Sequence, residues 1–142
     1  MSKLALLAVL ILGPPSVAAD EARMQREACE HYAPRSVALP GKLTEVRNYG
    51  PPNYGENPKT DARVKVLVLK LARPLSVCGD STSDINTESE KNVREVQLVM
   101  SDTSAKHLVG RAIVATGTLF HSHTGHHYTK ILMDVSEIRK KP

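Results

Sequence analysis

The sequence has no tryptophan and few other aromatic residues, with one phenylalanine and four tyrosines among its 142 residues. Proteins that bind single-stranded nucleic acid usually combine a cationic groove with aromatic side chains on which the bases stack. The positive excess is small as well, because the formal net charge is +4 and residues 139–141 supply much of it. This composition predicts that nucleic acid is not a partner.

Long apolar runs are also absent, apart from residues 4–12, which follow Lys3. A membrane-spanning helix needs about 20 apolar residues, so this run is too short and instead has the features of a signal peptide. We expect residues 1–19 to be removed by cleavage near Ala19. Residues 20–142 would then form a single periplasmic or secreted domain with no membrane anchor after processing. An uncleaved anchor is the alternative.

Cysteine is scarce, and Cys29 and Cys78 are the two that the chain contains. They are too far apart for a C-x-x-C motif, so nothing supports a thioredoxin-type redox role. An even number of cysteines outside the cytoplasm predicts a disulfide between them. Two buried free thiols, or a thiolate that binds a metal, are the alternatives.

Enzyme signatures are missing too. The sequence contains no H-E-x-x-H, no G-x-S-x-G and no glycine-rich phosphate loop. Ser122 lies between two histidines, but adjacent residues on a strand point to opposite faces, so neither is placed to deprotonate it. We therefore assign no catalytic residue and expect a protein that is not an enzyme.

What the sequence does contain is a series of short β patterns. Residues 63–71 alternate most clearly, since Val64, Val66 and Val68 share one face and the leucines lie on the other. Pro40 and Gly41 predict a bulge or a bend in the first strand, and Pro74 predicts the end of the second. The predicted elements are a short helix or arm over residues 20–30, strands over 37–46, 63–71, 93–100, 111–120 and 128–138, and a short helix over 103–109.

This order predicts a mostly β fold, a small five-stranded OB-like barrel with one short helix between strands 3 and 4. In the oligonucleotide/oligosaccharide-binding (OB) fold, a five-stranded Greek-key barrel binds ligands through one face and two neighbouring loops. A six-stranded variant or an open sandwich is the alternative architecture.

Four local runs carry a resemblance to a known family. They are C-E-H-Y-A-P at 29–34, V-x-L-x-G-x-L at 37–43, P-N-Y-G-E at 52–56 and G-x-L-F-x-x-x-T-G-H-H-Y-T at 117–129. Together they resemble a family of small exported bacterial proteins carried under a domain-of-unknown-function label. The T-G-H-H-x-T stretch is the most specific part, although Tyr128 stands where family members carry a third histidine. The resemblance implies export and a shared fold, and it implies no activity.

Four of the six histidines lie within seven residues, which is the most chemically distinctive feature of the chain: His121, His123, His126 and His127. Imidazole is a common ligand of zinc and copper. If Thr124 and Gly125 form a two-residue turn, three of the histidines share one face with Tyr128 and predict a Zn or Cu site made by His121, His123 and His126. In a three-residue loop His127 would replace His126. The alternatives are a recognition loop and plain packing.

The loop at residues 48–58 is rich in proline, glycine and asparagine and is the second candidate. In an OB-fold it would lie beside the histidine loop, so we expect Tyr54 and Glu56 near the histidines. Tyr54 is placed to stack on a sugar or a partner side chain, and Glu56 to accept hydrogen bonds or complete a metal site. The alternative is a rigid turn with Tyr54 as a packing lid.

The sequence therefore predicts an exported soluble binding or inhibitory module. Its partner would be an envelope protein or a glycan, recognised through the loops at 48–58 and 121–127. The binding residues predicted are Tyr54, Glu56, His121, His123, His126, His127 and Tyr128. The alternative function is a periplasmic protein that binds zinc or copper through the histidine-rich hairpin.

Overall fold

A computed structural model describes residues 28–101 and 104–142 of the chain. The predicted signal peptide and its cleavage position lie outside these described residues. Within the two described ranges, no helix is long and apolar enough to cross a membrane.

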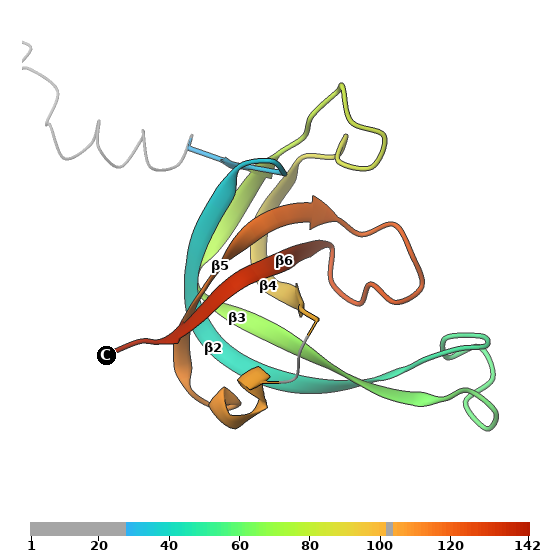
Figure 1. Cartoon of the computed structure of the whole chain (residues 1–142). Coiled ribbons are helices and arrows are strands. Elements are labelled where there is room, and N and C mark those ends of the chain that lie inside the picture. Colours follow the sequence, from blue (N-terminus) through green and yellow to red (C-terminus); the bar gives the residue numbers. More distant parts are fainter. Residues whose placement is uncertain (1–27, 102–103) are drawn as a thin grey trace, which may run out of the picture.

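Strands make up most of the described chain, as the sequence predicts, and they form one six-stranded sheet (Figure 1). A short 3-10 helix, η1, is the one helix in the described ranges. The elements are β1 (Glu30–His31), β2 (Ser36–Tyr49), β3 (Arg63–Cys78), β4 (Glu90–Val99), η1 (Ser104–Leu108), β5 (Ala112–His121) and β6 (Ile131–Lys140).

The hydrogen bonding between the strands runs in a ring. The order of neighbours is β1-β3-β2-β5-β6-β4, and a further pairing between β3 and β4 joins the ends of the five long strands. Most neighbouring strands are antiparallel, whereas β1–β3 and β4–β6 are parallel. Figure 1 shows the sheet curling around on itself, so that one face points inward.

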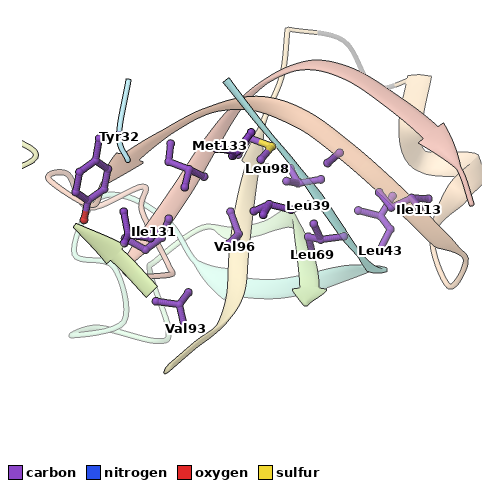
Figure 2. Close-up of a cluster of buried hydrophobic side chains, with 14 of the residues drawn as sticks. Tyr32, Leu39, Leu43, Leu69, Val93, Val96, Leu98, Ile113, Ile131 and Met133 are labelled. Atoms are coloured by element: carbon purple, nitrogen blue, oxygen red, sulfur yellow. The ribbon is translucent and has the colours of Figure 1, made fainter. Parts of the chain in front are cut away.

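That inward face holds the hydrophobic core (Figure 2). Alternate residues of each long strand point into it, as the period of two in a strand requires. Burying one such aliphatic side chain stabilises the fold by about 1.5–3 kcal/mol. The largest side chains of this cluster with no more than 1% exposure are Leu43, Leu69, Val77, Val96, Ile113, Leu119, Ile131 and Met133.

The predicted architecture is wrong in two details. The sheet has six strands instead of five, because Glu30 and His31 pair in parallel with Val77 and Cys78 ahead of the first predicted strand. Counted this way, no helix lies between the third and fourth strands, and η1 lies between β4 and β5. It is a short 3-10 helix that ends before Gly110, whose φ of 85° is a left-handed conformation that glycine adopts without strain.

Of the bulge or bend predicted at Pro40 and Gly41, the bulge is absent, since β2 passes both residues without a shift in register against β3 or β5. Gly41 has a different role there, because a Cβ at that position would collide with the carbonyl oxygen of Lys70. Strand β3 continues past Pro74 to Cys78, because Pro74 lies where the register with β4 shifts and no ladder bond needs its missing N–H.

The predicted disulfide is confirmed. Cys29 and Cys78 are bonded, with their Cα atoms 5.6 Å apart, and the described residues contain no free cysteine. The bridge fastens the start of the described chain to the end of β3. Tyr32, the residue after β1, is only 3% exposed and donates its hydroxyl hydrogen to the carbonyl of Glu88 (2.8 Å).

Strands β2 and β3 extend beyond the rest of the sheet. The pairing of β2 with β5 ends at Lys42, and that of β3 with β4 ends at Leu67, whereas β2 and β3 stay paired as far as Tyr49 and Arg63. Residues 46–49 and 63–66 therefore form a two-stranded projection, the β2–β3 arm, visible at the lower right of Figure 1. The arm carries the loop of residues 50–62 at its end.

Candidate functional site

The histidine loop, residues 122–130, connects β5 to β6. The last strand pair before it is His121 with Ile131, and the N–H of Ser122 then donates to the carbonyl of Lys130 (2.9 Å). The predicted antiparallel pairing of these two strands is confirmed. Neither a two-residue nor a three-residue turn joins them, because His123 does not pair with His126 and no strand begins at Tyr128. Thr124 does begin a turn, since its carbonyl accepts the N–H of His127 (3.1 Å).

Hydrogen bonds of Gln97 in β4 explain why β6 starts at Ile131 and not at the predicted Tyr128. Its side-chain oxygen accepts the N–H of Tyr128 (2.7 Å), and its side-chain nitrogen donates to the carbonyl of His126 (3.0 Å). The backbone N–H of Gln97 donates to the hydroxyl of Thr129 (2.9 Å). These hydrogen bonds satisfy polar groups of residues 126–129 that would pair with β5 if β6 began earlier. They hold the loop against β4 instead of β5.

The histidine loop covers part of the outer face of the sheet. Val68, Gln97, Leu132 and Phe120 are successive register partners on β3, β4, β6 and β5. Val68, Gln97 and Leu132 are at most 6% exposed, although their side chains point away from the main core. The ring of His127 packs edge-on against Phe120, with 5.5 Å between the ring centres. A second, smaller cluster therefore lies under the loop.

His121 lies at the base of the loop in a polar setting. Its Nε2 is 3.1 Å from a carboxylate oxygen of Glu90, and the other oxygen of Glu90 accepts a hydrogen bond from Lys130 (3.0 Å). These two partners, His121 first, lower the pKa of Glu90 below its usual range. The backbone N–H of His121 donates to the buried side chain of Asn86 (2.9 Å).

His123 and His127 form a pair further along. Their ring centres are 4.6 Å apart in an edge-to-face arrangement. The Nδ1 atom of His127 accepts the N–H of His123 (2.9 Å) and lies 3.3 Å from the N–H of Thr124. Burial lowers the pKa of His127, and the neighbouring His123 and His126 rings lower it further. The neutral imidazole of His127 is thus part of the turn.

The predicted metal set is not brought together. His121 contacts Glu90, His126 contacts Tyr54, and His123 contacts His127. In the part of the chain that the structure describes, no group of three or more His, Cys, Asp or Glu side chains is arranged to hold a metal ion. A zinc or copper ion needs converging ligands, so the arrangement of His121, His123 and His126 does not fit one.

Asp61 organises the second loop, residues 50–62. One carboxylate oxygen accepts the N–H (2.9 Å) and the side-chain amide (3.1 Å) of Asn53, and the other accepts the N–H groups of Gly55 (2.7 Å) and Asn57 (3.1 Å). Burial alone would raise the pKa of Asp61, but these hydrogen bonds outweigh it and the pKa is lowered. Asp61 is 7% exposed, so the loop is built around its carboxylate.

The two loops meet at Tyr54, as expected. Its hydroxyl group is 3.0 Å from Nε2 of His126, and the two rings pack edge-on with centres 5.3 Å apart. Gly125 permits this approach, because a Cβ there would lie 3.0 Å from the tyrosine ring. Tyr54 stays 38% exposed and has a φ of 52°, a left-handed conformation that costs a non-glycine residue about 1–2 kcal/mol.

Tyr128 makes a second connection between the loops. Its hydroxyl donates to the carbonyl of Tyr49 at the end of β2 (2.8 Å), and burial raises its pKa. Glu56, by contrast, is exposed, and its N–H donates to the carbonyl of Asn53 (3.2 Å). Among the described contacts, Glu56 has no hydrogen bond or ion pair to a histidine.

Residues 95–139 match one family model, Domain of unknown function (DUF4431). The match begins in β4, includes the whole histidine loop and ends in β6. It confirms, over this segment, the resemblance to a domain-of-unknown-function family. No curated protein and no solved structure matches the chain.

Three important residues of this site were not predicted: Gln97, Asp61 and Glu90. Gln97 lies within the residues that match DUF4431, and Glu90 lies just before them. Both contact residues about thirty positions further along the chain, which the sequence does not indicate. The one signal in the sequence was that Gln97 interrupts apolar residues of β4. Asp61 is one of several acidic residues in polar segments, and nothing in the sequence distinguishes it.

Proposed function

We propose that this chain is an exported binding or inhibitory module with an OB-like barrel, which recognises an envelope protein or a glycan. The ring of five long strands supports this fold, because OB-folds are small Greek-key barrels. Their ligands bind beside the loop after the first long strand and the loop before the last one. Those positions correspond to residues 50–62 and 122–130 here.

One observation carries the proposal: the contact between Tyr54 and His126. It joins two loops that are each fixed from within, one by Asp61 and the other by Gln97. Binding costs less conformational entropy when the binding surface is already ordered. The joined loops are called the two-loop surface below.

The chemistry of the two-loop surface suits a sugar ring or an apolar side chain. Tyr54 presents an aromatic ring that is 38% exposed and held in a strained conformation. Strained residues concentrate at functional sites, and tyrosine contributes large contact area with few rotatable bonds. The predicted signal peptide supports a partner outside the cytoplasm.

The test compares two variants of the two-loop surface with a control elsewhere. Tyr54→Ala removes the ring, and Gly125→Val pushes it from its position. Ile85→Ala removes a similarly exposed side chain, 42% exposed, from the loop between β3 and β4. Binding of residues 20–142 to isolated cell-wall glycan and to separated envelope proteins is measured with and without a chelator.

We expect both variants of the two-loop surface to weaken binding by about tenfold or more, as for an interface hot spot, with Ile85→Ala and the chelator having no effect. Equal losses in all three variants would contradict the proposal. Binding that disappears with the chelator would favour the metal-binding alternative.

A further inference from the structure

The β2–β3 arm brings like charges face to face. Arg47 and Lys65 are direct register partners across the two strands, and Arg63 occupies the next position on the same face, opposite Tyr49. Like charges directly opposite each other destabilise an antiparallel pair. Glu45 pairs with Lys65, and Tyr49 contacts Arg63 through its ring and its hydroxyl group. Arg47 and Arg63 have no ion pair with a carboxylate among the described residues.

A single carboxylate faces these cations. Glu45 forms an ion pair with Lys65 (2.6 Å), and that hydrogen bond, together with the charges of Lys65, Lys106 and Arg47, lowers its pKa. Lys106 comes from η1, so three elements contribute to the group. We call Arg47, Arg63, Lys65 and Lys106 the cationic face. Its four positive charges exceed the one negative charge of Glu45 by three.

The cationic face is open to a ligand. It continues the core-facing side of β2 and β3 beyond the ends of their pairing with β5 and β4. A hollow of about 440 Å³ lies among Arg47, Arg63, Val64 and Lys65. The guanidinium carbon of Arg63 is 3.7 Å from the centre of the Tyr49 ring, a cation–π contact that orients this side chain.

We propose that the cationic face binds an acidic segment of a protein partner in extended conformation. Residues two apart on a strand, such as Arg63 and Lys65, are about 6.6 Å apart. Carboxylates at alternate positions of an extended peptide repeat at the same interval, so each can meet one cation. Arginine also matches the carboxylate group with two parallel hydrogen bonds.

The cationic face is separate from the two-loop surface. Arg63 and Lys65 alternate with Val64 and Val66, so they point away from the outer face that the histidine loop covers further along the sheet. Binding at the cationic face therefore does not depend on the function proposed for the two-loop surface.

The experiment measures binding of three anionic probes to the protein by calorimetry at low and at high salt. One is a peptide in which glutamate alternates with threonine, the second has the same composition with its glutamates contiguous, and the third is polygalacturonate, a carboxylated polysaccharide. We expect the alternating peptide to bind best and its affinity to fall with salt, because exposed charges are screened.

Arg47→Gln combined with Arg63→Gln should weaken binding of the alternating peptide by about tenfold, since two charge-assisted contacts are lost. The matched control is Arg73→Gln combined with Arg94→Gln, which removes two exposed arginines outside the cationic face and should change the affinity little. Lys106→Gln provides a second test on η1, outside the strand pairing, in case the double variant unfolds.

Three results would overturn the proposal. Equal losses in the double variant and its control would mean that net charge alone attracts the peptide. Tighter binding of polygalacturonate than of the alternating peptide would make the partner a glycan. No saturable binding of either peptide at low salt would leave the cationic face without this ligand.

Discussion

Each of the two candidate loops is fixed by one buried polar side chain, Gln97 in the histidine loop and Asp61 in the loop of residues 50–62. The side chain of Gln97 pairs with one backbone N–H and one backbone C=O, and the carboxylate of Asp61 accepts three backbone N–H groups. None of these backbone groups has a strand neighbour. Buried backbone groups must be paired somewhere, so these residues take the place of a neighbouring strand. Substitution of either residue should therefore alter its loop, and for Gln97 that loop lies about thirty residues away in the sequence.

Gln97→Leu keeps a similar volume and removes both side-chain hydrogen bonds. It leaves the N–H of Tyr128 and the carbonyl of His126 unpaired, which should cost about 2–4 kcal/mol of unfolding free energy. The control is Glu95→Leu on the same strand, which loses an exposed ion pair with Lys70 worth less than about 1 kcal/mol. Urea unfolding measures both variants, and equal losses would show that Gln97 does not hold the loop.

Asp61→Asn tests the second loop. An amide has one acceptor oxygen where the carboxylate has two, and its NH2 group would face the N–H groups of Gly55 and Asn57 or that of Asn53. We expect a lower melting temperature and faster proteolytic cleavage within residues 50–62. Asp84→Asn, on an exposed part of the loop between β3 and β4, is the control. Unchanged proteolysis in Asp61→Asn would contradict the assigned role.

At the scale of elements, the strand predictions hold where the alternation of side chains is local. The pattern of residues 63–71 identified β3 and the face of Leu67 and Leu69 that packs toward the core. The prediction fails where a distant strand decides the outcome. Pro74 lies inside β3 because the ladder with β4 shifts there, and Tyr128 lies outside β6 because Gln97 binds its N–H.

The histidine loop should respond to acid through His127. Its Nδ1 atom accepts backbone N–H groups, so protonation of that atom breaks the turn. Because the folded state lowers the pKa of His127 below 6.5, the unfolded state binds more protons in this range. The stability from this residue is present above pH 6.5 and is lost as the pH falls from there through the lowered pKa.

Amide chemical shifts of His123 and Thr124 during an NMR pH titration measure this transition. His127→Phe keeps a ring against Phe120 but has no acceptor, so its loop should not change across the same pH range. His31→Gln, in β1, is the control and should behave as the unchanged protein does. A transition that persists in His127→Phe would mean that another group opens the loop.

At the scale of the whole molecule, the sequence indicated which loops lie close together but not which side-chain contacts they make. The order of the strands was enough to predict that Tyr54 lies near the histidines, because the loops of an OB-like fold share one side. The predicted three-histidine face does not form, since the pairing of β5 with β6 stops at His121 and Ile131, and sequence alone does not give the length of the loop between them. The cationic face was also missed, because Arg47 and Lys65 become neighbours only through the register of β2 and β3.

The disulfide affects the whole molecule, because it ties the start of the described chain to the ring of strands. Cys29 and Cys78 are 49 residues apart, and closing a loop of this length contributes about 4 kcal/mol in the chain-entropy model. The same bridge keeps β1 beside β3 and Tyr32 against Glu88. Its loss should therefore destabilise the whole molecule and loosen β1 first.

Cys29→Ser combined with Cys78→Ser should lower the unfolding free energy by about 2–4 kcal/mol. Urea unfolding with and without a reductant measures the effect. The reductant should shift the midpoint of the natural protein toward that of the double variant and leave the double variant unchanged, because no thiol remains in it. Hydrogen exchange should show early loss of protection at Glu30 and His31, since parallel pairing with Val77 and Cys78 depends on the bridge. Equal stability of the oxidised and reduced protein would mean that the core and the ring of strands hold the fold without it.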